Sequence, residues 1–170
     1  MTPWPLALTL LGACVATLTD LRTRTIPNWL TLPLLAFALA THALERGVWG
    51  LSLALLGSLV CFLPVYFLFT RHALGGGDVK LFAAFGALVG PRDGLELELT
   101  AFVLVTLFVL VTSVWSGRLL RLLVASWRAS LHLLRPARFP PPEAGAESVE
   151  LPMGLAILCA VLALAARSVS

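Results

Sequence analysis

Charged residues are scarce in this sequence. Asp, Glu, Lys and Arg make up only 12% of the 170 residues, whereas hydrophobic residues make up 59%. Ordinary globular proteins have roughly 45–50% apolar and about 25% charged residues. The mean hydropathy of +0.94 points the same way. This composition argues against a soluble globular protein and predicts a polytopic membrane protein, in which most side chains face lipid or other helices.

Paired cysteines are also lacking. Cys14, Cys61 and Cys159 each stand alone inside an apolar run, a spacing that excludes a zinc site or a disulfide framework and indicates small core residues. The stretch Leu11 to Cys14 has some likeness to a lipoprotein cleavage box. No Lys or Arg precedes it, however, and a secretory signal needs a positive start. We therefore expect the first apolar segment to be retained.

Six apolar runs follow one another along the chain, and each can form a membrane helix when its polar ends are included. The runs are 4–19, 29–44, 49–69, 79–90, 97–116 and 151–166. They predict an all-α fold with about six transmembrane helices in a single membrane-embedded domain, 1–170, with no separate soluble domain. The run 79–90 is short and carries Gly86 and Gly90, which predicts tight packing or an extension through the preceding glycines.

Basic residues set the expected orientation, because they concentrate on the cytoplasmic side of membrane proteins. If the first helix runs inward, nine of the twelve Lys and Arg residues lie inside: Arg22, Arg24, Arg71, Lys80, Arg118, Arg121, Arg128, Arg135 and Arg138. Four acids then fall in short outer loops: Glu45, Asp93, Glu96 and Glu98. Both termini are accordingly predicted outside.

A basic, amphipathic pattern occupies residues 118–135. Polar and small residues recur there at intervals of three and four: Arg118, Arg121, Ala125, Arg128, His132 and Arg135. This spacing predicts an interfacial amphipathic helix that contacts lipids of the inner leaflet. The alternative is the positively charged inner end of the preceding membrane helix.

Two aspartates are predicted at the same membrane depth. Asp20 ends the first helix on the inner side, and Asp78 begins the fourth beside three glycines, in the stretch 74–80. Paired carboxylates share a proton, so that one can act as base on a water molecule while the other acts as acid on a carbonyl, a chemistry that cleaves peptide bonds. The alternative is structural, with Asp20 as an interfacial cap and Asp78 as the N-cap of its helix.

The residues around these aspartates resemble a known family. The string Asp-Leu-Arg-Thr-Arg-Thr-Ile-Pro-Asn at 20–28, followed by Gly-Gly-Gly-Asp-Val-Lys at 75–80, is similar to the two signature regions of type IV prepilin peptidases. These are Gly-x-Gly-Asp membrane aspartic proteases. The Pro-Met-Gly start of the last helix, at 152–154, also fits the family.

The resemblance implies an activity and a location. The enzyme would remove the short basic leader from prepilins or pseudopilins at the cytoplasmic face of the inner (plasma) membrane, with Asp20 and Asp78 as catalytic residues and without any cofactor or metal. The chain lacks the cysteine-bearing insertion of longer members. It therefore looks like the short enzymes of tight-adherence (Flp-type) pili or of preflagellin processing, and N-methylation is left open.

Further residues are expected to shape the site. Ile26, Pro27 and Asn28 are predicted to do so from the loop, where Pro27 can start the second helix and Asn28 can satisfy loop backbone groups. The glycines let the backbone and an extended substrate approach closely: Gly75, Gly76 and Gly77. Lys80 is expected either to meet a substrate acid or a lipid phosphate, or to anchor the helix at the interface.

Two functions of other classes stay open. A small transporter or ion-coupled protein could use the same two carboxylates, and a membrane scaffold for pilus assembly would need neither. The expected partners are a prepilin or pseudopilin helix and membrane lipids, with no nucleic acid. The substrate's identity and the oligomeric state do not follow from the sequence.

Overall fold

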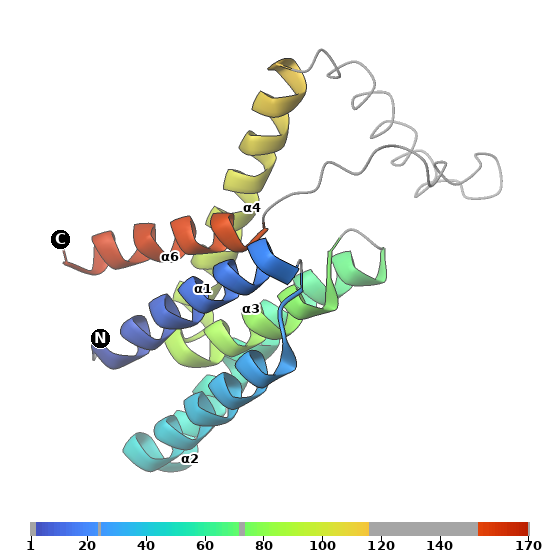
Figure 1. Ribbon diagram of the computed structural model, residues 1–170. Helices are drawn as coiled ribbons and strands as arrows, with labels where there is room; N and C mark the ends of the chain where they lie inside the picture. The colour runs from blue at the N-terminus through green and yellow to red at the C-terminus, as the bar shows by residue number, and fades with distance from the viewer. Residues whose placement is uncertain (1–2, 24, 72–73, 116–152, 170) are drawn as a thin grey trace, which may run out of the picture. The chain divides into compact units, whose positions relative to one another are not determined.

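The computed structural model describes residues 3–23, 25–71, 74–115 and 153–169, and every regular element in these ranges is an α-helix. The helices are α1 (Pro3–Thr23), α2 (Asn28–Thr70), α3 (Gly76–Val89), α4 (Pro91–Trp115) and α6 (Met153–Val169) (Figure 1). The predicted all-α class is confirmed. The interfacial helix predicted near 118–135 lies outside the described residues.

The chain divides into two compact units. The first contains residues 1–104 and 152–170, and thus α1, α2, α3, the beginning of α4 and α6. The second contains residues 105–151, of which the structure describes the remaining part of α4. All residues of the candidate site belong to the first unit. The single domain 1–170 stays a prediction.

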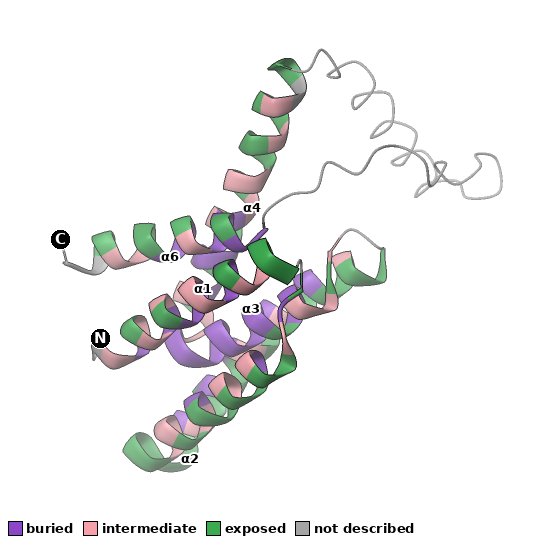
Figure 2. Cartoon of the chain, in the orientation of Figure 1, coloured by how far each residue is buried: buried purple, intermediate pink, exposed green. Residues whose placement is uncertain are grey.

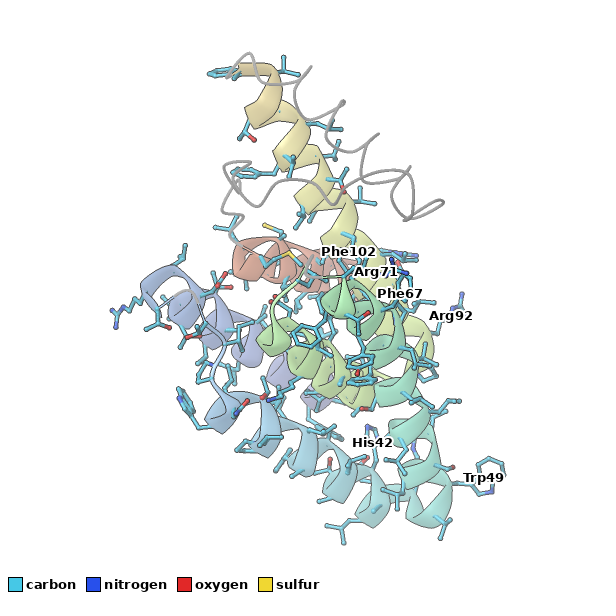
Figure 3. The ribbon with its side chains drawn as sticks, turned by 90° about the vertical axis from the view of Figure 1, so that its right-hand side faces the viewer. His42, Trp49, Phe67, Arg71, Arg92 and Phe102 are labelled. Carbon is cyan, nitrogen blue, oxygen red and sulfur yellow. The ribbon has the colours of Figure 1, made fainter. Side chains whose placement is uncertain are left out.

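Helix α2 changes direction at Gly47. This residue has φ 61° and ψ −144°, a backbone conformation that side chains beyond glycine rarely adopt. It separates two helical halves that correspond to the predicted runs 29–44 and 49–69, and Figure 1 shows the second half returning alongside the first. The exposed side chain of Trp49 projects outward just beyond the turn (Figure 3).

The first half of α2 lies parallel to α3, as two contacts at opposite ends show. At one end Lys80 Nζ donates a 2.7 Å hydrogen bond to Asn28 Oδ1. At the other end His42 Nε2 donates a 3.1 Å hydrogen bond to the carbonyl oxygen of Leu88. Since the last carbonyls of a helix have no partner within it, His42 satisfies one of these orphan groups.

The second half of α2 packs against α3 in the opposite direction. Gly57 and Gly86 face each other so closely that a Cβ on either would collide with the backbone of the other. Further along, the ring of Phe69 lies beside Gly76 at the start of α3. Small residues allow such close helix contacts in membrane proteins, where packing rather than water exclusion holds helices together.

Helix α3 forms the centre of the first unit. All its residues from Leu81 to Val89 are buried, with Phe82, Phe85 and Leu88 among the largest, whereas α1, α2 and α6 keep exposed faces (Figure 2). With 14 residues and about 1.5 Å per residue, α3 is about 21 Å long, less than a hydrocarbon core of about 30 Å. The tight packing expected of the run 79–90 is confirmed, and the helix does extend back through the glycine motif.

The exposed faces are apolar. Large hydrophobic side chains point outward along the helices, for example Leu11, Phe37, Leu59, Leu63 and Leu155. Three helical segments of the described chain are long and apolar enough to cross a membrane: Trp4–Thr23, Asn28–Thr70 and Pro91–Thr112. These features fit a membrane protein. The count of six spans and the outward termini stay predictions.

Glu98 lies within a helix and not in the outer loop predicted for it. The sequence suggested a short outer loop for it, but α4 begins at Pro91, six residues before the predicted run 97–116. Glu98 is therefore inside the helix and only 2% exposed. Glu96, another predicted outer acid, forms an ion pair with Arg167 of α6, which joins the start of α4 to the end of α6.

Candidate active site

Asp78 is buried in the first turn of α3. It is the third residue of the helix and 8% exposed. Its Oδ2 accepts a 3.2 Å hydrogen bond from the backbone N–H of Gly75, the residue that precedes the helix. The carboxylate thus folds back over the helix start, where unsatisfied N–H groups favour negative charge. Asp78 is not itself the N-cap considered from the sequence, since Gly75 occupies that position.

The surroundings of Asp78 raise its pKa. The residue precedes the apolar run 79–90 and lies outside the three candidate spans. Burial is the main reason why the pKa of Asp78 rises from 3.8 to about 6, the charge of Asp20 raises it further, and the hydrogen bond from Gly75 opposes both effects. The two predicted aspartates are therefore near enough for their charges to interact.

Asp20 is held between α1 and α6. It lies near the end of α1, is half-buried, and its Oδ2 accepts a 3.0 Å hydrogen bond from the N–H of Gly154 at the beginning of α6. The carboxylate thus faces the positive end of the α6 dipole. This contact differs from the headgroup-solvated cap that the sequence allowed as an alternative.

The segment Ile26-Pro27-Asn28 contacts the glycine motif directly. Ile26 is 9% exposed, and a Cβ on Gly77 would lie 2.8 Å from Ile26 Cβ and 3.0 Å from its carbonyl oxygen. Pro27 precedes α2 as its N-cap residue, so the helix begins at Asn28, one position after the start that the sequence suggested. The two signature segments are therefore in direct contact, and the approach of Ile26 leaves no room for a side chain at Gly77.

The other motif residues have looser surroundings. A Cβ on Gly76 would reach only the ring of Phe69, at 3.4 Å, and one on Gly75 would come 3.2 Å from Asp78 Oδ2. Lys80 is exposed, and its ammonium group binds the side chain of Asn28 rather than a group of its own helix. Asn28 thus pairs with a side chain, whereas the sequence suggested loop backbone groups.

Thr17 was not recognised as part of the site, and Gly154 was noted only within the start of the last helix. Thr17 Oγ1 donates to the carbonyl oxygen of Gly154 at 2.8 Å, on the same residue whose N–H binds Asp20. Thr17 precedes Asp20 by three positions, so both side chains lie on one face of α1. That spacing was a signal in the sequence, but nothing there linked it to Gly154, which lies 137 residues away.

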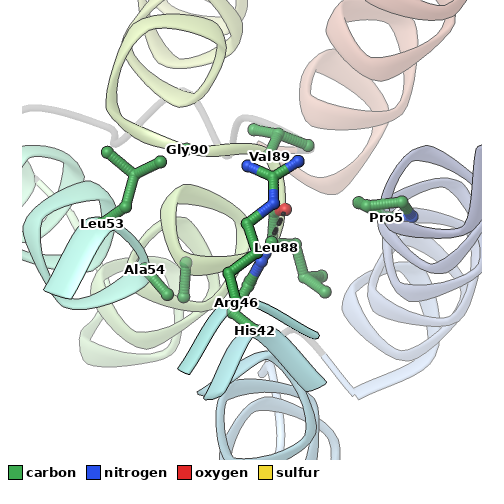
Figure 4. A pocket seen from close by; sticks show the side chains of 9 residues that line it. Pro5, His42, Arg46, Leu53, Ala54, Leu88, Val89 and Gly90 are labelled. Carbon is green, nitrogen blue, oxygen red and sulfur yellow. Dashed lines mark hydrogen bonds between the residues drawn. The ribbon is translucent and has the colours of Figure 1, made fainter. Parts of the chain in front are cut away.

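A separate cavity lies at the far end of α3. It has a volume of about 100 Å³ and is lined by residues of α1, α2 and the end of α3 (Figure 4). His42, Arg46 and Leu88 are among its lining residues. The cavity is thus remote from Asp78, which is at the opposite end of the same helix. Within the described residues, no group of three or more His, Cys, Asp or Glu side chains could hold a metal ion.

Comparison with known proteins identifies a family. Residues 7–114 match the model of the type IV leader peptidase family. The matched range includes Asp20, the segment Ile26-Pro27-Asn28, Asp78 and Lys80, but not α6. No curated protein and no solved structure matches the chain.

Proposed function

Since the chain belongs to the type IV leader peptidase family, we propose that it is a membrane aspartic endopeptidase that removes the short basic leader from prepilins or pseudopilins. One observation supports this proposal most strongly: Asp20 and Asp78, from different helices, interact electrostatically at one end of the first unit. Buried, interacting carboxylates are the groups that metal-free peptide hydrolysis needs.

In the proposed mechanism, the two aspartates share one proton and divide the acid and base roles. Asp78, whose pKa is raised to about 6, carries the proton and donates it to the oxygen of the scissile carbonyl. Asp20 takes a proton from a water molecule, whose oxygen attacks the carbonyl carbon. The tetrahedral intermediate then breaks at the C–N bond, the amine leaves with the proton held by Asp20, and Asp78 regains one from the intermediate.

The loop and glycines supply the proposed substrate path. Gly75 and Gly76 present backbone with little side-chain bulk beside Asp78, so an extended substrate segment can approach the carboxylate closely. The loop at Ile26 borders the same point. We propose that the leader junction lies here and that the apolar part of the pilin remains in lipid against the exposed apolar helix faces. The excess of basic residues predicted on this side supports a cytoplasmic site.

The test is leader removal in cells that co-express the chain with a prepilin, followed by electrophoretic mobility and mass. We expect wild type to cleave and both Asp20→Asn and Asp78→Asn to lose cleavage, because Asn keeps the size but cannot transfer the proton. Asp93→Asn is the matched control, since Asp93 lies in the first turn of α4 outside the site.

Two results would contradict the proposal. Cleavage that persists in either Asp20→Asn or Asp78→Asn would exclude a two-aspartate mechanism. Failure of the wild type to cleave prepilins of several pilus systems, with normal amounts of protein in the membrane, would favour the transporter or scaffold alternatives.

A further inference from the structure

Two residues of α1 bind the backbone of Gly154 in α6, a contact that we call the clamp. The Gly154 carbonyl oxygen accepts from Thr17 Oγ1 at 2.8 Å, and the Gly154 N–H donates to Asp20 Oδ2 at 3.0 Å. We propose that Thr17 is a positioning residue, which fixes the Asp20 carboxylate through Gly154. This inference rests on the proposed peptidase function for its catalytic consequence, but the clamp itself can be measured separately.

The Thr17 hydroxyl is placed to hold two helices together. Thr17 is 5% exposed, and its single hydroxyl proton is shared between the carbonyl oxygens of Ala13, at 2.7 Å, and Gly154, at 2.8 Å. The first bond stays within α1, whereas the second crosses to α6. A buried hydrogen bond across helices resists their separation.

Helices α1 and α6 approach each other closely at Gly154. A Cβ on Gly154 would lie 2.8 Å from the Cα of Thr17 and 3.2 Å from both Cβ and Oδ2 of Asp20. The backbone of α6 therefore lies directly against the turn of α1 that carries Thr17 and Asp20. If the Thr17 bond is lost, the Gly154 N–H moves, and the Asp20 carboxylate loses the donor that orients it.

Such a loss would affect the reaction more than substrate binding. Acid and base groups must be held in place, and a displacement of about 1 Å can reduce the rate by roughly 100-fold. Thr17 is buried, and within the described residues its hydroxyl group bonds only to the backbone carbonyl oxygens of Ala13 and Gly154. Its removal should therefore lower kcat and leave KM nearly unchanged.

The chain offers a matched control in Thr9. This residue is on the same helix, is fully buried, and donates to the carbonyl oxygen of Pro5 at 2.7 Å, the same bond to the residue four positions earlier that Thr17 makes. Its bond stays within α1. Thr9→Val therefore removes a buried hydroxyl from α1 without touching the clamp.

The experiment compares wild type, Thr17→Val, Thr17→Ser and Thr9→Val as purified full-length proteins in detergent. The substrate is a purified prepilin with a basic leader, a glycine and an apolar helix. We expect kcat of Thr17→Val to fall roughly 10- to 100-fold, with KM within about twofold of the wild-type value. Thr17→Ser keeps the hydroxyl group and should retain most of the activity, and Thr9→Val should resemble wild type. If Thr17→Val does not accumulate, Thr17→Ala takes its place.

Hydrogen exchange at the Gly154 amide provides a readout that does not depend on catalysis. We expect exchange to be roughly 3- to 10-fold faster in Thr17→Val than in wild type, the effect of one lost hydrogen bond, and unchanged in Thr9→Val. Unchanged exchange in Thr17→Val, or Thr17→Ser as inactive as Thr17→Val, would overturn the clamp. The wild type could also fail to cleave any prepilin while exchange at Gly154 is still faster in Thr17→Val and unchanged in Thr9→Val. That result would reject the proposed function and leave the clamp supported.

Discussion

Lys80 Nζ and Asn28 Oδ1 lie 2.7 Å apart and form a hydrogen bond between residues separated by 52 positions. Lys80 belongs to the glycine-aspartate segment and Asn28 to the Ile-Pro-Asn segment, so the bond joins the two regions that define the resemblance to the family. Both side chains are exposed. The bond is therefore better suited to fixing the loop next to Asp78 than to stabilising the whole fold.

The first prediction concerns this bond. Asn28→Ala and Lys80→Ala should each reduce prepilin cleavage several-fold, and the double variant should lose little more than either single variant, because both remove the same interaction. The free energy of unfolding, measured by thermal denaturation, should change by less than about 1 kcal/mol in each case, since exposed hydrogen bonds contribute little. If the fold-reduction in cleavage of the double variant equals the product of the two single reductions, the two residues act independently and the prediction is wrong.

The second prediction uses two adjacent glycines. Gly77→Ala should abolish most activity and destabilise the protein by about 1–3 kcal/mol, because its Cβ would lie 2.8 Å from Ile26 Cβ and 3.0 Å from the Ile26 carbonyl oxygen. Gly76→Ala is the control for stability, since its Cβ would meet only the Phe69 ring at 3.4 Å. Thermal unfolding measures the stability of both variants, and prepilin cleavage measures the activity of Gly77→Ala. Equal losses of stability in the two variants would contradict this account of the Ile26 contact.

The sequence was sufficient for the features that depend on local pattern. The apolar runs predicted the helices, and two aspartates at helix ends predicted charges that interact, which the pKa of Asp78 supports. Contacts between distant residues were not accessible in this way. The bond from Gly154 to Asp20 depends on how α6 packs against α1. The start of α4 at Pro91, six residues before the predicted run, is a boundary that hydropathy alone fixes only within a few residues.

The third prediction concerns the turn in α2. Gly47 has φ 61° and ψ −144°, close to a region that is nearly exclusive to glycine and costs other residues about 1–3 kcal/mol. Gly47→Ala should therefore lower the free energy of unfolding by this amount, although no atom lies within 4 Å of the added Cβ. Gly47→Asn should be no better, because Asn favours positive φ only with positive ψ. Rescue by Asn would indicate an ordinary left-handed turn instead.

The fourth prediction concerns the pH dependence of stability. The pKa of Asp78 is about 6 in the folded protein against an ordinary value of 3.8, so the folded state binds this proton more tightly than the unfolded state. Between these two pH values the unfolded chain releases the proton first, and the contribution of Asp78 to stability falls as pH rises. Above about pH 6 the full cost of the buried charge remains, on the order of 1–3 kcal/mol.

Asp78→Asn removes this cost while retaining an oxygen that can accept the hydrogen bond from Gly75. The variant should therefore unfold at a higher temperature than wild type at pH 8, and the difference should vanish below about pH 4, where Asp78 is protonated in both states. Thermal unfolding in detergent from pH 4 to pH 8 measures this difference, and acids common to both proteins cancel. Asp93→Asn is the control outside the site. A gain in stability at pH 8 can arise only if ionised Asp78 is unfavourable in the folded protein. An Asp78→Asn variant less stable than wild type at pH 8 would therefore contradict the prediction and show that the fold stabilises the carboxylate.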